Sequence, residues 1–477
     1  MLWLIILLVL FILQIAIILI VEFRHPAKTV AWLMILFIFP LIGFIMYYFL
    51  AKEYTHRKTV KKKGRRKLGH FQRELLKQTQ KHTHVVTDAN FHELKQEPRL
   101  YGLLNHIPGS LLTRNNQVKV LTNAEAAYKA MLEAIELAKA HIHFEFYTIR
   151  HDHIGNQFKE ALIRKAEQGV KVRVIYDGVG SYQLSSDYVK QLRQAGIEVY
   201  PFLPALIAFF DKRMNYRNHR KIVVVDGTTG FTGGLNIGDE YLGSDPRLGF
   251  WRDTHLQLDG DSVYYLQHTF LNDWNFVSKQ KLTDATFFPR HEIRESSLVQ
   301  IISSGPDAHW DSILEMFFGG LVAAHKRIYI TTPYFIPDAS ISMALKTAAI
   351  SGIDVRIILP EVADSRMVQY ASRSYIQELL QAGVRFYLYR KGFVHAKVVI
   401  IDHLLAVVGS ANMDMRSFFS NFELNAVMFD SLTIQRLEVD FKVDLQASVE
   451  LKLAEFQKRS RLEKGKEVIA RLLSPLF

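Results

Sequence analysis

A pattern of eight residues that occurs twice constrains this chain more than any other feature. It reads HRKIVVVD at 219–226 and HAKVVIID at 395–402, and a Gly-rich turn ending in Asn follows each copy, GGLN at 233–236 and GSAN at 409–412. Three further segment pairs recur in the same order: HIHFEFYTI with RIYITTPYFI, GVKVRVIYD with GIDVRIILP, and AGIEVYPF with AGVRFYLY. The chain is therefore predicted to contain two similar units that bring both copies of the pattern to one shared site.

Each copy of the pattern places a His and a Lys on one face of a strand, because residues i and i+2 of a strand point the same way. The apolar runs IVVV and VVII that follow are typical of strands buried on both faces. The Asp that ends each copy stands before a turn, where a turn-holding role and a direct chemical role are both open. The candidate catalytic residues are His219, Lys221, Asp226, His395, Lys397 and Asp402.

Length and charge limit the class of protein. The 477 residues are enough for two or three domains of ordinary size. The chain has no cysteine, which excludes disulfides, zinc–thiolate sites and cysteine nucleophiles. Its formal net charge of +12 indicates a polyanionic partner, either nucleic acid or an anionic membrane surface.

The distribution of apolar and basic residues favours the membrane over nucleic acid. Leu2–Val21 and Val30–Leu50 are apolar stretches of 20 and 21 residues, and a helix of that length spans about 30 Å of hydrocarbon. Residues 51–67 then hold nine Lys or Arg against one Glu. We expect a two-span hairpin with the C-terminal bulk in the cytoplasm. The basic segment is then either a lipid contact on the anionic leaflet or an ordinary topology signal.

The remaining chain is predicted to be α/β. Helical patterns at 123–140, with Asn123 as N-cap, and at 155–167 alternate with the strands, which favours mixed sheets covered by helices. The tail SRLEKGKEVIARLLSPLF fits an amphipathic helix on the membrane or a helix packed on the domain. The expected parts are a transmembrane hairpin (1–50), a basic segment and linker (51–109), and two repeats (110–295 and 296–477).

The residues of the doubled pattern suit a phosphodiester without a metal ion or cofactor. The sequence shows no convincing carboxylate cluster, HExxH motif or Walker A loop, and the HDH at 151–153 fits a polar loop better than a metal site. Lys221, Lys397, Asn236 and Asn412 would instead neutralise and hold the phosphoryl oxygens. One histidine would attack phosphorus while the other protonates the leaving oxygen.

The doubled motif with GGLN and GSAN resembles the phospholipase D superfamily, and within it the bacterial cardiolipin synthases. Further matching stretches are RHPAKTVAWL, NYRNHRKIVVVDG, FWRDTHLQLDG, PYFIPD, GSANMDMRSFFSNFELN and ARLLSPLF. The resemblance covers essentially the whole chain. One departure is YFLAKEY after the second apolar stretch, where the family pattern leads us to expect a Gly.

The resemblance implies roles for individual residues. It implies that His219 is the nucleophile and His395 the general acid and base. It also implies that a carboxylate from the opposite repeat orients each histidine, Glu423 for His219 and Asp253 for His395. The fold implied is two phospholipase D-like repeats with one composite site at a pseudo-twofold interface.

The implied reaction is transfer of a phosphatidyl group from one phosphatidylglycerol to another, giving cardiolipin and glycerol at the bacterial plasma membrane. Three alternatives remain open at this stage. A phospholipase D-type hydrolase would use the same residues with water as acceptor. A nuclease of the same superfamily is disfavoured by the predicted hairpin, so we expect no nucleic acid partner. A scaffold that has lost activity is disfavoured by the two intact motifs.

Overall fold

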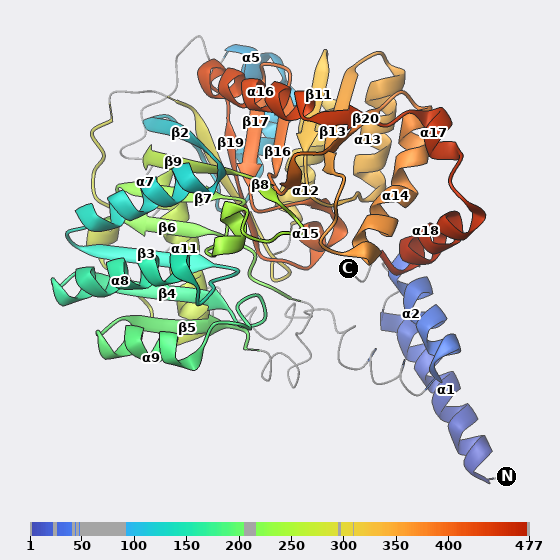
Figure 1. The fold of residues 1–477 in the computed structure, drawn as a ribbon, viewed down its shortest axis with the longest axis horizontal. Coiled ribbons are helices and arrows are strands. Elements are labelled where there is room, and N and C mark those ends of the chain that lie inside the picture. Colours follow the sequence, from blue (N-terminus) through green and yellow to red (C-terminus); the bar gives the residue numbers. More distant parts are fainter. Residues whose placement is uncertain are drawn as a thin grey trace.

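The computed structural model describes residues 2–21, 26–40, 43, 47, 92–204, 216–293, 297–308 and 310–474. Figure 1 shows two α/β units side by side, with a pair of apolar helices projecting below the second unit. Each unit is built on one large sheet, and the strands near the centre of each sheet are buried along their whole length. The predicted mixed α/β class is confirmed by these sheets and by the structural relatives described below.

The sheet of the first unit has the order β2-β9-β7-β6-β3-β4-β5. Its strands are β2 (Asn116–Thr122), β3 (His141–Phe146), β4 (Lys171–Asp177), β5 (Glu198–Phe202), β6 (Ile222–Val225), β7 (Thr229–Gly233) and β9 (Thr254–Gly260). Strands β3, β4 and β5 run parallel, and the remaining pairs are antiparallel. The three segment pairs that recur in the sequence supply β3, β4 and β5 here.

The sheet of the second unit has the order β1-β10-β19-β17-β16-β11-β13-β14-β20. Its strands are β1 (Leu112–Thr113), β10 (Val299–Ser304), β11 (Arg327–Thr331), β13 (Asp354–Pro360), β14 (Arg385–Tyr389), β16 (Val398–Ile401), β17 (Leu405–Gly409), β19 (Glu423–Met428) and β20 (Ser448–Glu450). Without the two edge strands β1 and β20, this order matches the first sheet strand for strand. The duplication read from the sequence is therefore a duplication of sheet topology.

One edge strand crosses the expected domain boundary. Strand β1 lies within the expected first repeat, 110–295, yet it pairs with β10 of the second sheet, Leu112 opposite Gln300. The preceding helices α5 (His92–Gln96) and α6 (Pro98–His106) supply Leu100 and Leu104 to the core of the second unit. The segment before residue 116 thus covers the second repeat, although it was expected to belong partly to a linker and partly to the first repeat.

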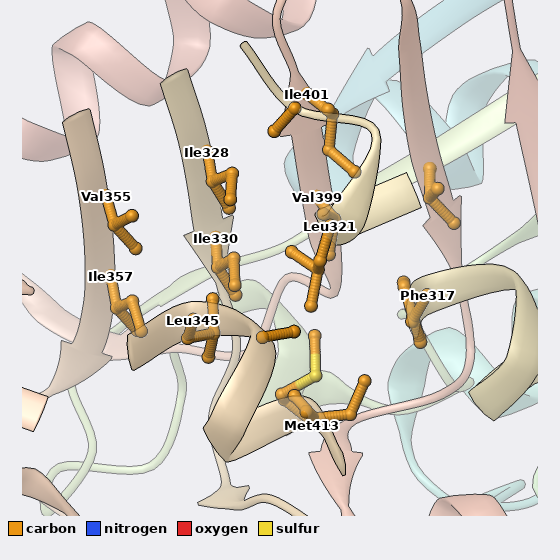
Figure 2. Packing of buried hydrophobic residues seen from close by; sticks show 14 of the residues in the cluster. Phe317, Leu321, Ile328, Ile330, Leu345, Val355, Ile357, Val399, Ile401 and Met413 are labelled. Atoms are coloured by element: carbon orange, nitrogen blue, oxygen red, sulfur yellow. The ribbon is translucent and has the colours of Figure 1, made fainter. Parts of the chain in front are cut away.

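Helices cover the sheets as the sequence periodicity predicted. Around the first sheet lie α7 (Asn123–Leu137), α8 (His153–Glu167), α9 (Ser186–Gln194) and α11 (Val263–Ser278). Around the second lie α12 (Ser312–Val322), α13 (Ala339–Ile350), α14 (Arg366–Gln381), α15 (Met415–Phe419), α16 (Ser431–Gln446), α17 (Leu453–Gln457) and α18 (Arg461–Leu473). Figure 2 shows apolar residues of α12 and α13 packed against those of β11, β13 and β16, and burial of apolar surface between these layers stabilises the unit.

The start of α7 differs from the sequence prediction. Asn123 was expected to cap the helix, but the N-cap is Thr122, and Asn123 adopts a positive φ of 68° as the first helical residue. Its side-chain oxygen instead accepts a hydrogen bond from the backbone N–H of Asp253 at 3.2 Å. The side chain of Asn123 therefore makes a long-range contact in place of the helix cap that local rules predict.

The two units share a buried seam. A single apolar cluster contains Ile222, Leu256 and Phe270 of the first unit together with Val398 and Phe422 of the second. Two short strand pairings also cross it: β8 (Phe250–Arg252) runs parallel to β15 (Gly392–Val394), and Asn218 bridges to Phe422. Each pairing lies directly before one copy of the doubled motif: Val394 precedes His395, and Asn218 precedes His219.

The N-terminal region forms two helices, α1 (Leu2–Val21) and α2 (Pro26–Ile38). They pack against each other through Ile18, Trp32 and Leu36. Among the described residues, no helix reaches the combined length and apolarity that a membrane-crossing helix requires. The basic segment 51–67 lies outside the described residues. After residue 40, most of the second predicted span does too.

Candidate active site

The first copy of the motif begins where the two units meet. The backbone N–H of His219 donates to the carbonyl of Phe422 at 2.9 Å, and Phe422 N–H donates to Arg217 at 2.9 Å. This short parallel pairing aligns His219 with Glu423, the next residue on the other strand. Nδ1 of His219 lies 3.0 Å from both carboxylate oxygens of Glu423. Because a carboxylate only accepts, Nδ1 carries the proton and Nε2 is left with its lone pair.

The second copy begins in the same way with the units exchanged. The backbone N–H of His395 donates to the carbonyl of Arg252 at 2.7 Å, at the end of the β8–β15 pairing. Nδ1 of His395 lies 2.8 Å from Oδ2 of Asp253, the residue after Arg252. Each histidine is thus held by a carboxylate of the opposite unit, so the duplication of the sheets extends to the site.

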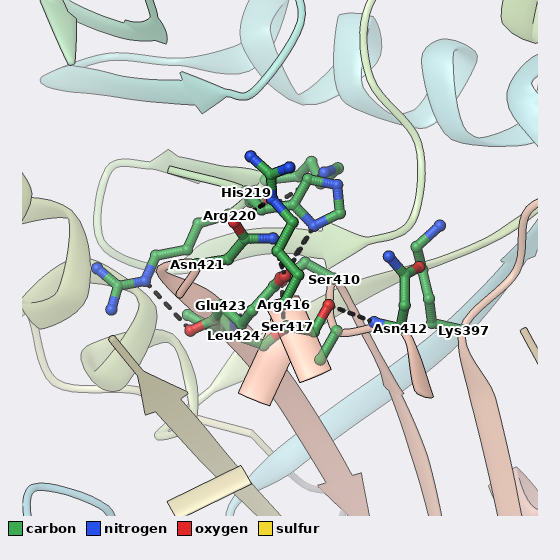
Figure 3. A network of polar contacts seen from close by, with 12 residues as sticks. His219, Arg220, Lys397, Ser410, Asn412, Arg416, Ser417, Asn421, Glu423 and Leu424 are labelled. Carbon is green, nitrogen blue, oxygen red and sulfur yellow. Dashed lines mark hydrogen bonds and ion pairs between the residues drawn. The ribbon is translucent and has the colours of Figure 1, made fainter. Parts of the chain in front are cut away.

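Both carboxylates are fully buried and have further hydrogen-bond donors. The hydroxyl of Ser410 donates to Oε2 of Glu423, and Nδ2 of Asn421 donates to Oε1 at 3.1 Å. Figure 3 shows this group, with Glu423 between the two donors and the ring of His219. Oδ1 of Asp253 accepts from the N–H of Thr254 at 2.8 Å. The donors fix both carboxylates and therefore the orientation of both rings.

A glycine is required beside Asp253. A Cβ on Gly234, the second Gly of GGLN, would lie 2.0 Å from Oδ1 of Asp253. In the equivalent turn of the second repeat, a Cβ on Gly409 would lie 2.1 Å from Oδ1 of Asn425. The Gly-rich turns therefore provide the space into which polar side chains of the neighbouring strands fit closely.

The two lysines lie directly beneath the histidines. Nζ of Lys221 donates to the carbonyl of His219 at 2.7 Å. Nζ of Lys397 donates to the carbonyl of His395 and lies 3.0 Å from its Nε2. Lys221 has no exposed surface and Lys397 only 4%. Lys397 is thus fixed beside the ring of His395, and Lys221 beside the backbone of His219.

The protonation states of the histidines follow from this environment. Burial lowers the pKa of His219 to about 4, with Lys221 and Lys397 adding to the effect and Glu423 opposing it. Burial, followed by Lys397, lowers the pKa of His395 to about 3. Each histidine is influenced by the lysine of the other repeat, so the two motifs form one electrostatic unit. In the protein without substrate both rings are neutral near pH 7, which suits a nucleophile.

The two lysines and the two orienting carboxylates of the site also have shifted pKa values. Burial lowers the pKa of Lys221 to about 7 and that of Lys397 to about 8, against the opposing attraction of buried carboxylates. Burial acts to raise the pKa of Asp253 and Glu423, but their histidine and lysine neighbours outweigh it and leave both pKa values lowered. A bound phosphodiester anion would raise the pKa values of the histidines and lysines, and so allow a histidine to take up from solvent the proton that a general acid needs.

The two asparagines of the Gly-rich turns differ in their contacts. Oδ1 of Asn236 accepts from Thr148 N–H at 3.2 Å, and its Nδ2 donates to the Tyr241 hydroxyl at 3.1 Å. Oδ1 of Asn412 is buried without a hydrogen-bond partner, and its side chain lies beside Lys397 in Figure 3. Asn236 therefore supports the loop of the first unit, whereas Asn412 is the better placed of the two to contact substrate.

The two Asp residues of the motifs lie at the ends of β6 and β16 that are remote from the histidines. The carboxylate of Asp226 accepts from the backbone N–H groups of residues 139, 140 and 141 at 2.7–2.8 Å. That of Asp402 accepts from those of residues 325, 326 and 327 at 2.7–2.9 Å. Both residues have a positive φ, 52° and 50°. The sequence left two roles open for these residues. Their placement favours the turn-holding role and gives no support to a direct chemical role.

Replacement of Asp226 by Ala is expected to affect stability rather than catalysis. It would leave three backbone N–H groups without their acceptor, and each unsatisfied group that stays buried costs about 1–3 kcal/mol. We expect a lower thermal midpoint with kcat close to that of the unchanged protein. Asp402→Ala should behave alike, because its contacts are equivalent. A large loss of kcat in a variant of unchanged stability would contradict this assignment.

The HDH segment has a structural role. Asp152 is the N-cap of α8, and its Oδ1 accepts from Gly155 N–H at 2.9 Å. The neighbouring His151 contacts the hydroxyl of Ser185 at 2.7 Å. Within the part of the chain that the structure describes, no group of three or more potential metal ligands is found.

Several residues of the site were not identified from the sequence. Ser410 and Asn421 hold Glu423, and Asn123 holds the backbone of Asp253. Arg220, the middle residue of the first motif, donates to the carbonyls of Glu423 at 3.2 Å and of Ser304 at 2.9 Å, and so ties the motif to the second sheet. The partly exposed Arg416 donates from Nε to Oδ1 of Asn421 at 3.3 Å, and so adds a cation next to the residues that hold Glu423. Ser410, Asn421 and Arg416 all lie within the GSANMDMRSFFSNFELN run, which was the available signal.

Together, two matching sheets and one His-x-Lys from each define a duplicated phospholipase D-like protein. The family model described as "Cardiolipin synthase, PLD-like domain" matches residues 131–274 and 320–445. The chain belongs to this cardiolipin synthase family.

Named relatives agree over nearly the full length. The cardiolipin synthase of Halalkalibacterium halodurans is 42% identical over 465 residues, covering 97% of this chain and 92% of the relative. That of Geobacillus kaustophilus is 43% identical over 467 residues, with 97% and 91% covered. Among solved structures, the phosphatidylserine synthase of Haemophilus influenzae shares the fold, with a TM-score of 0.61 at 16% identity over 79% of this chain and 96% of that one.

Proposed function

We propose that the protein is a cardiolipin synthase, a phosphatidyltransferase that joins two phosphatidylglycerol molecules and releases glycerol. The observation that carries this proposal is the similarity to cardiolipin synthases at 42–43% identity over 97% of the chain. The site supports it chemically, since it offers two neutral, buried histidines beside two fixed cations. The reaction exchanges one phosphodiester for another, so it needs no activated donor.

In the proposed mechanism His219 attacks phosphorus through Nε2, because its Nδ1 is occupied by Glu423. Binding of the anionic substrate raises the pKa of His395, and its Nε2 takes up a proton from solvent. A bond then forms between Nε2 of His219 and phosphorus while the bond to the glycerol oxygen breaks, and His395 donates its Nε2 proton to that oxygen. The terminal hydroxyl of a second phosphatidylglycerol then gives its proton to His395 and displaces the histidine. Lys221 and Lys397 stabilise the extra charge on the phosphoryl oxygens, with Asn412 as a further donor.

The choice of a lipid acceptor over water is proposed from the setting of the site. His219 and His395 are only 9% and 7% exposed, which limits access of water to the intermediate. A phospholipase D-type hydrolase with the same catalytic residues is the alternative, since the catalytic groups themselves do not distinguish the two acceptors.

We further propose that the N-terminal region anchors the protein in the bacterial plasma membrane as a two-span hairpin. The apolar composition of Leu2–Val21 and Val30–Leu50 and the packing of α1 on α2 support this. The nine basic residues within 51–67 favour a cytoplasmic catalytic part, in contact with the anionic leaflet. The two repeats, 110–295 and 296–477 in the sequence, form the catalytic part.

A test uses the purified full chain in mixed micelles with phosphatidylglycerol as the sole lipid, with EDTA and without nucleotide. Mass spectrometry would resolve the products. Formation of cardiolipin and glycerol is expected, since the proposed mechanism requires neither metal nor activated donor. Phosphatidic acid without cardiolipin would instead assign the protein as a hydrolase.

Anion binding should depend on pH through the two lysines. Sulfate keeps its charge near neutral pH and is expected to inhibit by occupying the phosphate position. Because the pKa values of Lys221 and Lys397 are lowered to about 7 and about 8, both lose their charge as the pH rises through this range. The inhibition constant should then rise by up to about tenfold per pH unit for each lysine. An inhibition constant that stays unchanged from pH 6 to beyond pH 9 would contradict these charges.

A further inference from the structure

The C-terminal helix α18 has two contrasting faces. One face packs on α14 and is pinned there: Nη1 of Arg471 donates to the carbonyl of Ser374 at 3.0 Å, and Ser474 bonds the Tyr375 hydroxyl at 3.1 Å. Glu467 is buried on this face, 3.2 Å from Arg459. The helix is therefore a packed part of the second unit.

The other face of α18 is apolar and exposed. Leu462, Val468, Ile469 and Leu472 share it, at the spacing of a helical stripe, and their exposed fractions are 71%, 58%, 51% and 37%. The exposed charges of the helix that do not pack on α14 are basic: Arg461, Lys464 and Lys466. The acidic residues are occupied elsewhere, Glu463 in the N-terminal capping box and Glu467 in its buried ion pair. An exposed apolar stripe accompanied by cations is the pattern of a helix at a lipid–water interface.

The position of α18 points to the same partner. It contacts α2, as Figure 1 shows at the lower right of the molecule. The end of α2 exposes Phe37 and Ile38, so the helix that α18 contacts has exposed apolar surface of its own. One lipid surface could cover exposed apolar residues of both helices.

We propose that this face of α18 docks on the surface of an anionic lipid bilayer and sets the orientation of the catalytic part on the membrane. The proposal rests on the membrane-bound function proposed above and adds a second lipid contact, separate in sequence from the N-terminal hairpin. Docking would immerse the four apolar side chains about 5–10 Å deep, at the level of the headgroups.

Helix α16 provides a matched control within the same unit. Val439 and Val443 are 56% and 58% exposed, as much as the residues of the α18 stripe. However, α16 lies at the far end of the molecule from α1 and α2 (Figure 1). The same probe can therefore be placed on two equally exposed apolar faces that differ in their distance from the N-terminal helices.

The absence of cysteine from the chain allows the test with a single label. Ile469→Cys and, separately, Val439→Cys would carry an environment-sensitive fluorophore in the full chain, reconstituted in phosphatidylglycerol–phosphatidylcholine vesicles. Lipids with a nitroxide near the headgroup would serve as quencher. We expect the fluorescence of the label at 469 to be blue-shifted and strongly quenched. The fluorescence of the label at 439 should be neither shifted nor quenched.

Charge provides the second arm of the test. Lys464→Gln and Lys466→Gln should each weaken docking of the labelled helix about fivefold, from about 1 kcal/mol per basic residue at an anionic surface. A label at 469 that stays unquenched, as it would if a second copy of the chain covered this face, would overturn the proposal. Equal quenching at 469 and 439 would overturn it too.

The same vesicles distinguish failure of this proposal from failure of the proposed function. Cardiolipin formation with an unquenched label at 469 would contradict only the proposed docking of α18. A quenched label without cardiolipin formation would leave the docking intact and remove the assigned activity.

Discussion

Replacement of either motif histidine by Gln should lower cardiolipin formation by at least about 10⁴-fold, the scale seen when a nucleophile or its proton-transfer partner is removed. His219→Gln removes the atom that bonds to phosphorus, and His395→Gln removes the proton donor for the leaving glycerol. The two losses should not add in the double variant, because each step needs both rings. The rate is measured as cardiolipin formed from phosphatidylglycerol alone.

His268 offers the matched control for this prediction. Like the motif histidines it is buried, and burial lowers its pKa to about 4. It lies on α11, outside both motifs. His268→Gln should retain activity in proportion to the folded protein. Near-normal rates in either motif variant would contradict a mechanism that uses both repeats.

Replacement of the orienting carboxylates should have the next largest effect, a loss of about 10²–10⁴-fold in kcat for Glu423→Gln and for Asp253→Asn. Each change keeps the shape of the side chain and removes its negative charge. The amide can present its N–H to Nδ1, which would select the tautomer with the proton on Nε2 and so block attack or proton uptake there. The imidazolium that forms during the reaction would also lose its counter-charge.

If Glu423 and Asp253 had only a structural role, their replacement would leave the tautomers of the two histidines unchanged. The ¹⁵N chemical shifts of His219 should report a proton on Nδ1 in the unchanged protein and a shift of the tautomer population toward Nε2 in Glu423→Gln. Glu438→Gln is the control, since Glu438 is a buried carboxylate that pairs with Arg327 at 2.7 Å, outside the doubled motif. Unchanged kcat and an unchanged tautomer in Glu423→Gln would refute the orienting role.

The repeat and its buried strands could be predicted because they depend on local pattern. The runs IVVV and VVII are buried at every position, and the recurring segments form equivalent strands in two sheets of matching order. The His and Lys of each copy were expected on the motif strand itself, but β6 begins at Ile222 and β16 at Val398, so both pairs lie in the segments that lead into these strands. The repeat and the buried runs required no knowledge of distant contacts.

The parts that could not be predicted depend on contacts between residues far apart in the chain. Asn123 obeys a rule for helix caps in its sequence context, yet Asp253 takes its side chain. Ser410 and Asn421 are ordinary polar residues until the fold places Glu423 between them. The pairings of Glu423 with His219 and of Asp253 with His395 came only from resemblance to a family, since no local pattern links residues over 200 and over 140 positions apart.

The two motif Asp residues illustrate a third case. Their place before a turn suited a structural and a chemical role equally well. In the structure each carboxylate accepts three backbone N–H groups, a set of contacts that needs the start of β3 or β11 to lie beside the end of the motif strand. Sheet topology, which the motif itself does not contain, is what separates the two roles.

The covalent intermediate is the most direct test of the proposed chemistry. The full chain would be mixed rapidly with excess phosphatidylglycerol, quenched in denaturant at alkaline pH to preserve phosphohistidine, and measured by intact-protein and peptide mass spectrometry. The account predicts one phosphatidyl group on the peptide that contains His219, with one glycerol released per protein before cardiolipin accumulates. Cardiolipin and glycerol that appear together from the first turnover, with no phosphatidyl group on either motif histidine, would contradict it.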